Sequence, residues 1–276
     1  MKQNILNNYV STNDFPVITR GKRKYLTYEG LEDSYVYILK KGIIKTSIIS
    51  RDGREFNLNY INKMDIISLL KDEYSQFANA PFNIRVESDT AELYQVDRVR
   101  FWKDVNRDVD LQIYVKDYYR TRLLQSIKKM QQMLMNGKLG AICTQLYELY
   151  TLFGVEIAPD QYLIDFLVSN EEIGHFCGIN SASSVNRIFQ QLKKEGVITM
   201  QNRYIIIKKL DVIQENVIFY PLFLKEYRIL SVMSPMMINK LPTIKFSKSL
   251  KSQKIEIPIL DSPRKTKTKP TTSKTK

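Results

Sequence analysis

Histidine and cysteine are scarce in this sequence, and their scarcity excludes several classes of site. Its 276 residues include one histidine, His175, and two cysteines, Cys143 and Cys177. A single imidazole excludes a metal site built from several histidines, and two thiols cannot hold a four-thiolate iron–sulfur cluster. The cysteines have no CxxC spacing, so we expect no disulfide framework and take a reducing cytoplasm as the simpler location.

Long apolar runs and common catalytic motifs are also missing. No apolar run reaches the ~18 residues that a membrane helix needs, and the first residues lack an apolar core of signal-peptide length. GxSxG, GxGxxG and P-loop motifs do not occur. We therefore expect a protein that is not an enzyme, needs no cofactor and does not bind a membrane.

Positive charge is abundant but uneven. The formal net charge is +13, and residues 240–276 contribute +9 of it. Such an excess favours a polyanionic partner. The end of the chain is rich in Lys, Ser, Thr and Pro and cannot bury apolar surface, so we expect disorder there. Two interpretations remain open for this tail: it adds phosphate contacts, or it has no particular function.

Residues 169–208 predict two helices joined by a tight turn and followed by a short β-hairpin. Ser or Asn residues at 169–170 and 180–181 can cap the two helices, and Gly178 and Gly196 can end them. This order of elements is typical of a winged helix-turn-helix.

The second predicted helix has two faces of different chemistry. Its apolar face follows 3.6-residue spacing and consists of Val185, Ile188, Phe189 and Leu192. Its polar face consists of Ser183, Arg187, Gln190 and Lys194. Arg can bond guanine through two hydrogen bonds, Gln suits adenine and Ser suits either base, so the polar face fits a DNA major groove. A merely solvated surface is the simpler alternative, but the complete order of elements favours DNA.

The first hundred residues have a β pattern. We expect a short helix or arm over 1–24, followed by strands at 34–39, 43–50 and 54–60. Asp52-Gly53 predicts a tight hairpin turn. A second hairpin is expected from strands 82–87 and 91–96. Several short strands at this spacing indicate a small barrel or jelly-roll sandwich.

A long helix is predicted over about 107–135, with apolar residues at alternating steps of three and four in its C-terminal half. This spacing favours a coiled-coil dimer seam over simple packing on the β-domain. The predicted dimer residues are Ile113, Leu123, Ile127, Met130 and Leu134. A core helix should follow at 139–153, then a strand or extended link at 161–168, and a last short helix that ends near Pro221.

The predicted fold class is therefore α+β, in four parts. These are a β-roll over residues 1–106, a dimerisation helix over 107–136, a C-terminal winged helix-turn-helix over 137–218 and a basic extension over 219–276.

Three stretches resemble the Crp/Fnr family of bacterial transcription regulators, over about residues 15–215. Y-V-Y-I-L-K-K-G-I-I-K-T looks like the family's effector roll, which resembles cyclic-nucleotide-binding domains. E-E-I-G-H-F-C-G-I-N-S-A-S-S-V-N-R-I-F looks like its DNA-binding signature, and N-G-K-L-G-A-I-C-T-Q-L is most similar to the PrfA-like branch of Gram-positive virulence regulators. The resemblance implies a homodimer that binds a palindromic site in double-stranded DNA and contacts RNA polymerase.

The same resemblance suggests which side chains touch DNA. Ser183, Ser184 and Arg187 would read bases, with Ser181 a weaker candidate and Gln190 on the same face. Lys193, Lys194 and Arg203 would hold phosphates, which fixes register but carries no sequence information.

The resemblance leaves the identity of an effector open. Cyclic-nucleotide-binding members have a Gly-Glu followed by a phosphate-binding Arg, but here the Gly-Glu is missing and the Arg is missing or displaced to Arg85. An unpaired buried phosphate would be poorly stabilised, which argues against cyclic AMP. PrfA-like members are associated with glutathione, so glutathione or a similar small peptide is one expectation, and no effector at all is another.

The residues that would line such a peptide site are Ile61, Asp65, Gln125, Cys143, Gln145 and Phe153. Cys143 would be redox-active if exposed, but its apolar helix favours a buried, inert thiol. A different class of function also stays open: a protein-interaction module in which the helix-turn-helix is vestigial. That alternative predicts that Arg187→Ala leaves the main activity intact.

Overall fold

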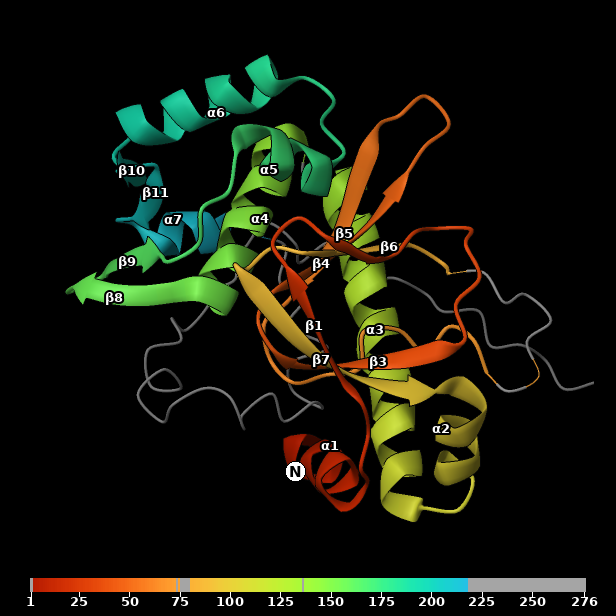
Figure 1. Ribbon diagram of the computed structural model, residues 1–276. Coiled ribbons are helices and arrows are strands. Elements are labelled where there is room, and N and C mark those ends of the chain that lie inside the picture. Colours follow the sequence, from red (N-terminus) through yellow and green to blue (C-terminus); the bar gives the residue numbers. More distant parts are fainter. Residues whose placement is uncertain (1, 73, 75–79, 136, 218–276) are drawn as a thin grey trace, which may run out of the picture. The chain divides into compact units, whose positions relative to one another are not determined.

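The computed structural model describes residues 2–72, 74, 80–135 and 137–217 (Figure 1). The chain divides into two compact units, residues 1–219 and 220–276, and the second lies outside the described residues. The prediction of a disordered basic tail therefore falls outside them as well.

Two antiparallel sheets form the N-terminal β-roll. One has the strand order β1 (Val17–Gly21), β7 (Thr90–Asp97), β3 (Tyr35–Lys41). The other has the order β2 (Tyr25–Thr27), β6 (Asn83–Val86), β4 (Ile44–Ile49), β5 (Glu55–Ile61). A small jelly-roll-like sandwich was predicted and is confirmed. Strand β1 was not predicted, because it lies in a polar segment for which only a helix or arm was expected.

The hairpin predicted at Asp52-Gly53 is confirmed. Strands β4 and β5 pair directly, and the amide of Gly53 donates to the carbonyl of Ser50 over 2.8 Å. Gly53 has φ +82°, a conformation that glycine adopts without steric cost.

The second predicted hairpin is wrong, because β6 and β7 belong to different sheets. The chain crosses between the sheets at Ser88, whose hydroxyl accepts the amide hydrogen of Ile43 over 2.8 Å. Gly42 allows this close approach: it has φ +109°, and a Cβ there would lie 2.7 Å from the carbonyl oxygen of Thr90. The segment at Gly42 and Ile43 thus packs against the segment at Ser88 and Thr90. On either side of this contact, β6 pairs with β2 and β4, and β7 pairs with β1 and β3.

Three helices accompany the roll: α1 (Lys2–Thr12), α2 (Arg98–Val105) and α3 (Val109–Met135). Residues of α1, α2 and α3 share a core with strands of the roll, including Leu6, Phe101 and Leu111. Helix α2 was not predicted. The predicted long helix is present and starts at Val109.

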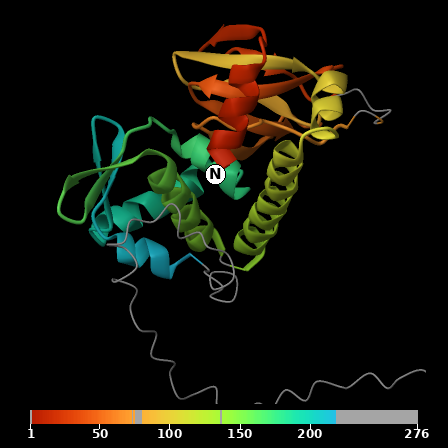
Figure 2. The ribbon, with the colours of Figure 1, turned by 90° about the horizontal axis from the view of Figure 1, so that it is seen from below.

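Helix α4 (Gly137–Phe153) follows α3 after a sharp reversal of chain direction, and Figure 2, which views the structure from below, shows the two helices as the arms of a V. Gly137 has φ +59°, so the reversal uses the left-handed conformation that favours glycine. The core helix predicted at 139–153 is confirmed.

The C-terminal domain continues through β8 (Gly154–Ala158), β9 (Gln161–Ile164), α5 (Asn170–Cys177), α6 (Ala182–Lys194), β10 (Ile198–Gln201), β11 (Tyr204–Ile207) and α7 (Leu210–Glu215). Its sheet has the order β10-β11-β9-β8. Strand β8 was not predicted. Helix α7 ends at Glu215 and not near Pro221, because Asn216 caps it and its side-chain amide donates to the carbonyl of Val212 over 2.9 Å.

Candidate functional site

Helices α5 and α6 form the predicted helix-turn-helix, and local hydrogen bonds fix the start of each. A capping box begins α5: the Ser169 hydroxyl accepts the amide hydrogen of Glu172 over 3.1 Å, and the Glu172 carboxylate accepts that of Ser169 over 3.4 Å. Gly178 ends α5 with φ +66°. Ser181 caps α6 by accepting from the amide of Ser184. These caps were predicted from the sequence, apart from the choice between neighbouring residues.

Helix α6 presents the predicted polar face to solvent. Its apolar residues are buried: Val185, Ile188, Phe189 and Leu192. The opposite residues are exposed: Ser183, Arg187, Gln190 and Lys194. Ser181 is exposed as well, whereas Ser184 and Lys193 are half-buried. All the side chains expected to touch DNA except Arg203 therefore lie on or beside one accessible face of α6.

Lys138 was not predicted from the sequence as a DNA-binding residue, yet its side chain reaches this face. Its ammonium donates to the Ser184 hydroxyl over 3.4 Å. The two residues are 46 positions apart, so no local pattern connects them. A cation beside the first turn of α6 adds to the positive charge of the polar face.

The short hairpin predicted after α6 is confirmed, and β10 and β11 are its strands. Asn202 and Arg203 have φ values of +49° and +71°, and Gln201 pairs with Tyr204 across the turn. Two successive positive φ values are typical of a type I′ hairpin turn. Arg203 is exposed at the tip, where a phosphate could reach it.

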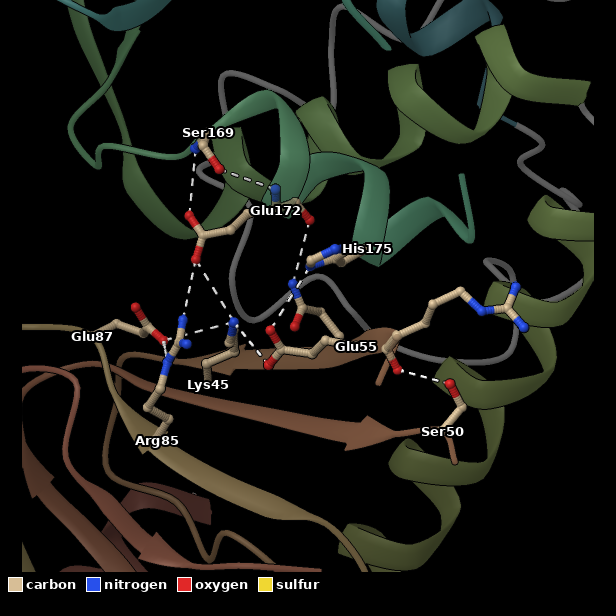
Figure 3. A network of polar contacts seen from close by, with 10 residues as sticks. Lys45, Ser50, Glu55, Arg85, Glu87, Ser169, Glu172 and His175 are labelled. Carbon is tan, nitrogen blue, oxygen red and sulfur yellow. Dashed lines mark hydrogen bonds and ion pairs between the residues drawn. The ribbon is translucent and has the colours of Figure 1, made fainter. Parts of the chain in front are cut away.

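A group of ionisable side chains lies between the roll and α5, and we call it the junction cluster (Figure 3); Lys45 is buried and the other members are half-buried. Its members are Lys45, Glu55, Arg85, Glu87, Glu172 and His175. The Lys45 side chain has no exposed surface, and its ammonium lies 3.2 Å from Glu55, 3.7 Å from Glu172 and 3.9 Å from Glu87. The roll supplies four members, and α5 supplies Glu172 and His175.

Arg85, the residue considered above as a displaced phosphate ligand, is occupied within this cluster. Its guanidinium donates to Glu87 over 2.6 Å and to Glu172 over 3.3 Å. Burial raises the pKa of Glu87 above its usual value, although Arg85 and Lys45 oppose the shift. Burial alone would raise the pKa of Glu55 too, but Ser47 and the charges of Lys45 and Arg85 outweigh it and leave that pKa low.

Strand β5 and the residue that follows it also contact the C-terminal domain and α3. Tyr60 is buried in that domain's core, with ring centroids 4.8 Å from Phe176 and 5.1 Å from Phe166. The Asn62 amide donates to the carbonyl of Leu152 over 2.7 Å. Lys129 of α3 donates to the carbonyls of two β5 residues, 57 and 58, over 2.9 and 2.7 Å.

The six residues proposed for a peptide effector do not gather in one cavity. Ile61 lies in the roll core, and Cys143 and Phe153 lie in the core of the C-terminal domain. Asp65 is paired with Arg122 over 3.0 Å, and Gln125 is exposed near Arg122 on α3.

Only Gln145, among the six, lines a small cavity between α3, α4 and α5, together with Lys129, Thr144, Glu148 and Cys177. Its volume of about 10 Å³ suits a single water molecule. A peptide would need these helices to move apart.

Both thiols are buried. Cys143 has no exposed surface, and burial raises its pKa to about 11; burial raises the pKa of Cys177 to about 12. The prediction that Cys143 is buried is confirmed, and its protonated thiol is a poor nucleophile at neutral pH.

The C-terminal half of α3 leaves its predicted dimer face uncovered. Leu123, Ile127 and Met130 are 62%, 40% and 52% exposed, and Ile113 is 44% exposed. The side chain of Leu134 lies outside the described residues.

Within the described ranges, no group of three or more His, Cys, Asp and Glu side chains could hold a metal ion. The same part of the chain has no helix long and apolar enough to cross a bilayer.

Comparison with known proteins places these features in context. Residues 141–215 match the model of the Crp-like helix-turn-helix domain. The chain is 50% identical to the lactate racemization regulatory protein of Lactiplantibacillus plantarum, over 76% of this chain and 94% of that protein. It is 28% identical to the listeriolysin regulatory protein of Listeria monocytogenes, over 74% of this chain and 85% of that protein.

A solved structure shares the fold. A transcriptional regulator of the CRP/FNR family from Thermus thermophilus superposes with a TM-score of 0.60 at 13% identity. The match covers 73% of this chain and 98% of that one.

Proposed function

Since the chain belongs to the Crp/Fnr family of transcription regulators, we propose that it binds a two-fold symmetric DNA site as a homodimer, through two copies of α6. The observation that carries this proposal is the exposed polar face of α6 on a helix whose other face is fully buried. Because the family consists of DNA-binding regulators, we propose no catalytic role for this chain.

Base reading is assigned to the first two turns of α6. Arg187 would bond a guanine, and Ser183 and Ser184 would contact neighbouring bases. Lys193, Lys194 and Arg203 would bind phosphates, with Gln190 and Ser181 at the margins of the same face. Exposure supports contact with DNA for Ser183, Arg187, Lys194 and Arg203, all of which are open to solvent.

Dimerisation is assigned to α3. An apolar stripe of Leu123, Ile127 and Met130 on an exposed helix face is costly in water and is stabilised by burial against a second copy. In the dimer, two α6 helices would enter successive major grooves about 34 Å apart. RNA polymerase is the further partner proposed for a regulator of this kind.

Regulation by a small effector is proposed for the region between the roll and the C-terminal domain. The small cavity lined by Gln145 and Lys129 lies between α3, α4 and α5, and these helices would have to move apart for a ligand to bind there. Glutathione is one candidate. The similarity to the lactate racemization regulatory protein, at 50% identity, suggests that this chain controls genes for lactate racemisation. The lactate enantiomers are then further candidate effectors.

The test is selection of duplexes from a random DNA pool by the purified protein at ~150 mM salt, where non-specific phosphate binding is already weakened. A symmetric consensus with half-sites one helical turn apart is expected. Repeating the selection with reduced glutathione, L-lactate or D-lactate tests each effector. Binding without any consensus, lost as salt rises, would favour a protein-interaction module with a vestigial helix-turn-helix.

A further inference from the structure

The junction cluster connects strands β4 and β6 of the roll to the first helix of the helix-turn-helix through one carboxylate. Glu172 uses its two oxygens differently. One oxygen belongs to the capping box that begins α5, and the other lies 3.3 Å from Arg85 and 3.7 Å from Lys45 (Figure 3). A side chain that defines the start of α5 is therefore also held by the roll.

Helix α5 carries α6 with it, because the two helices are in tight contact. A Cβ on Gly174 would lie 2.8 Å from the carbonyl oxygen of Ile179 and 3.3 Å from a methyl group of Val185 on α6. Such close packing leaves no room for α5 to shift without α6. Whatever fixes the start of α5 therefore fixes the reading face as well.

The roll side of the cluster can exist without Glu172. Lys45 retains Glu55 at 3.2 Å, and Arg85 retains Glu87 at 2.6 Å, both within the roll. Separation of α5 would thus expose these pairs to water without leaving a buried charge unpaired, which is the case that makes broken buried ion pairs costly. Glu172 is an additional partner of these two pairs.

Other residues of the roll also contact α5 at this junction. The Asn57 amide donates to the carbonyl of Glu172 over 3.3 Å, and His175 of α5 lies 3.8 Å from Glu55. All of these contacts reach α5 from the four-stranded sheet of the roll. In the same structure, the polar face of α6 is accessible.

We infer that Arg85 and Lys45 are positioning residues for DNA reading: they hold α5 through Glu172 in the orientation in which α6 meets its site. This inference rests on the proposed function, because it presupposes specific DNA binding. It assigns to the roll a direct electrostatic contribution to operator affinity. A change in β4 or β6 would alter that contribution without touching DNA.

Glu172→Gln is the discriminating variant. Glutamine can still close a capping box, so α5 should keep its start while the charge held by the roll is lost. The matched control is Glu171→Gln, the same change one position earlier on the same helical turn, at an exposed side chain. Both variants would be compared with the unaltered full chain by fluorescence anisotropy, on the selected operator and on a scrambled duplex, alongside thermal unfolding.

The expected result is a loss of operator affinity of about fivefold or more in Glu172→Gln, in the usual range of coupling between sites. Affinity for the scrambled duplex should be unchanged, and Glu171→Gln should bind both duplexes as the unaltered chain does. Equal operator affinity in Glu172→Gln and Glu171→Gln would overturn the inference. Failure of the unaltered chain to select any operator would instead contradict the proposed function.

A double-mutant cycle with Arg85→Gln tests whether the effect passes through the roll. The double variant should lose no more operator affinity than the single variant that binds the operator less tightly. If instead the fold-loss of the double variant equalled the product of the two single fold-losses, the inference would be overturned. Arg85→Lys keeps a positive charge beside Glu172 and is expected to retain most of the operator affinity. If Arg85→Gln does not fold, Arg85→Lys provides the answer, because a loss in that variant equal to the loss in Glu172→Gln would contradict a role for charge.

Discussion

At the scale of single residues, Arg187 is the side chain on which sequence preference should depend most. Its guanidinium is exposed on the polar face of α6 and can bond both acceptors of a guanine. Arg187→Ala should cost about 1–3 kcal/mol of specific binding and relax preference at one guanine in each half-site. Affinity measured on operators altered at each position gives the check.

Lys194→Ala is the control for that prediction. A lost phosphate contact should weaken binding to all sequences alike. It should also reduce the slope of log affinity against log salt concentration by about one. If Arg187→Ala left the preference for bases untouched, α6 would not be the reading helix.

Cys143 tests whether a thiol on α4 takes part in redox sensing. Because burial raises its pKa to about 11, the thiolate is rare at pH 8 and the sulfur is shielded. The folded protein should therefore resist iodoacetamide at pH 8, and urea should make both cysteines reactive, as followed by mass spectrometry. Rapid alkylation of Cys143 in the folded protein would show that α4 opens and would revive the redox hypothesis.

At the scale of elements, the crossing between the two sheets depends on Gly42. A Cβ there would meet the carbonyl oxygen of Thr90 at 2.7 Å, at a φ of +109°. Gly42→Ala should reduce the free energy of unfolding by more than about 2 kcal/mol. Urea denaturation measures this value.

Gly53→Ala is the matched control, since Gly53 also has positive φ but nothing lies within 4 Å of its Cβ position. Its cost should be about 1–2 kcal/mol, from the backbone alone. Equal losses in the two variants would mean that the close approach at Gly42 contributes nothing.

Local patterns explain which elements the sequence could predict. Caps, glycines and 3.6-residue spacing lie within a few positions of each other in α5 and α6, and Asp52-Gly53 specifies its own turn. The partners of β6 and β7 depend on contacts that Gly42 and Ile43 make with residues 48 and 45 positions further along the chain, so two adjacent strands were wrongly paired with each other.

The candidate site was predictable to the same extent. The polar face of α6 follows from its own spacing, whereas Lys138 reaches Ser184 from another helix. Lys45 sits in an apolar strand sequence, I-I-K-T-S-I-I, and its carboxylate partners are 10, 42 and 127 positions away. A buried lysine of this kind has no local signal.

Helix α3 carries the prediction about assembly. Leu123→Glu places a charge at the most exposed residue of the apolar face, where a Leu side chain would gain about 1.5–3 kcal/mol from full burial. The symmetric seam contains two copies, so the dimer dissociation constant should rise by at least about tenfold. Sedimentation at several concentrations gives the measurement.

Val99→Glu is the control, because Val99 is 55% exposed on α2 and lies off the predicted seam. It should leave the association state unchanged. A Leu123→Glu protein that remained dimeric would place the dimer interface elsewhere.

At the scale of the whole molecule, a symmetric dimer imposes a fixed distance between its two DNA-reading helices. Insertion of about half a helical turn, roughly five base pairs, between the operator half-sites rotates one half-site to the opposite face of the duplex. Affinity should fall by at least about a hundredfold, toward non-specific binding. Replacing the central base pairs without changing their number is the control. Undiminished binding to the lengthened operator would contradict a rigid dimer with two reading heads.

Tyr60 has a consequence for how such a protein can be recombined. The residue belongs to the roll by sequence but to the C-terminal core by packing, between Phe153, Phe166 and Phe176. The two domains are therefore not interchangeable modules. A chimera that joined this C-terminal domain to a foreign sensor would keep its whole DNA-reading surface and yet have a hole in its interior, unless the donor supplied an aromatic ring at the same place. Exchange of sensors among relatives should thus require an aromatic ring at this position, in addition to the roll residues that hold α5.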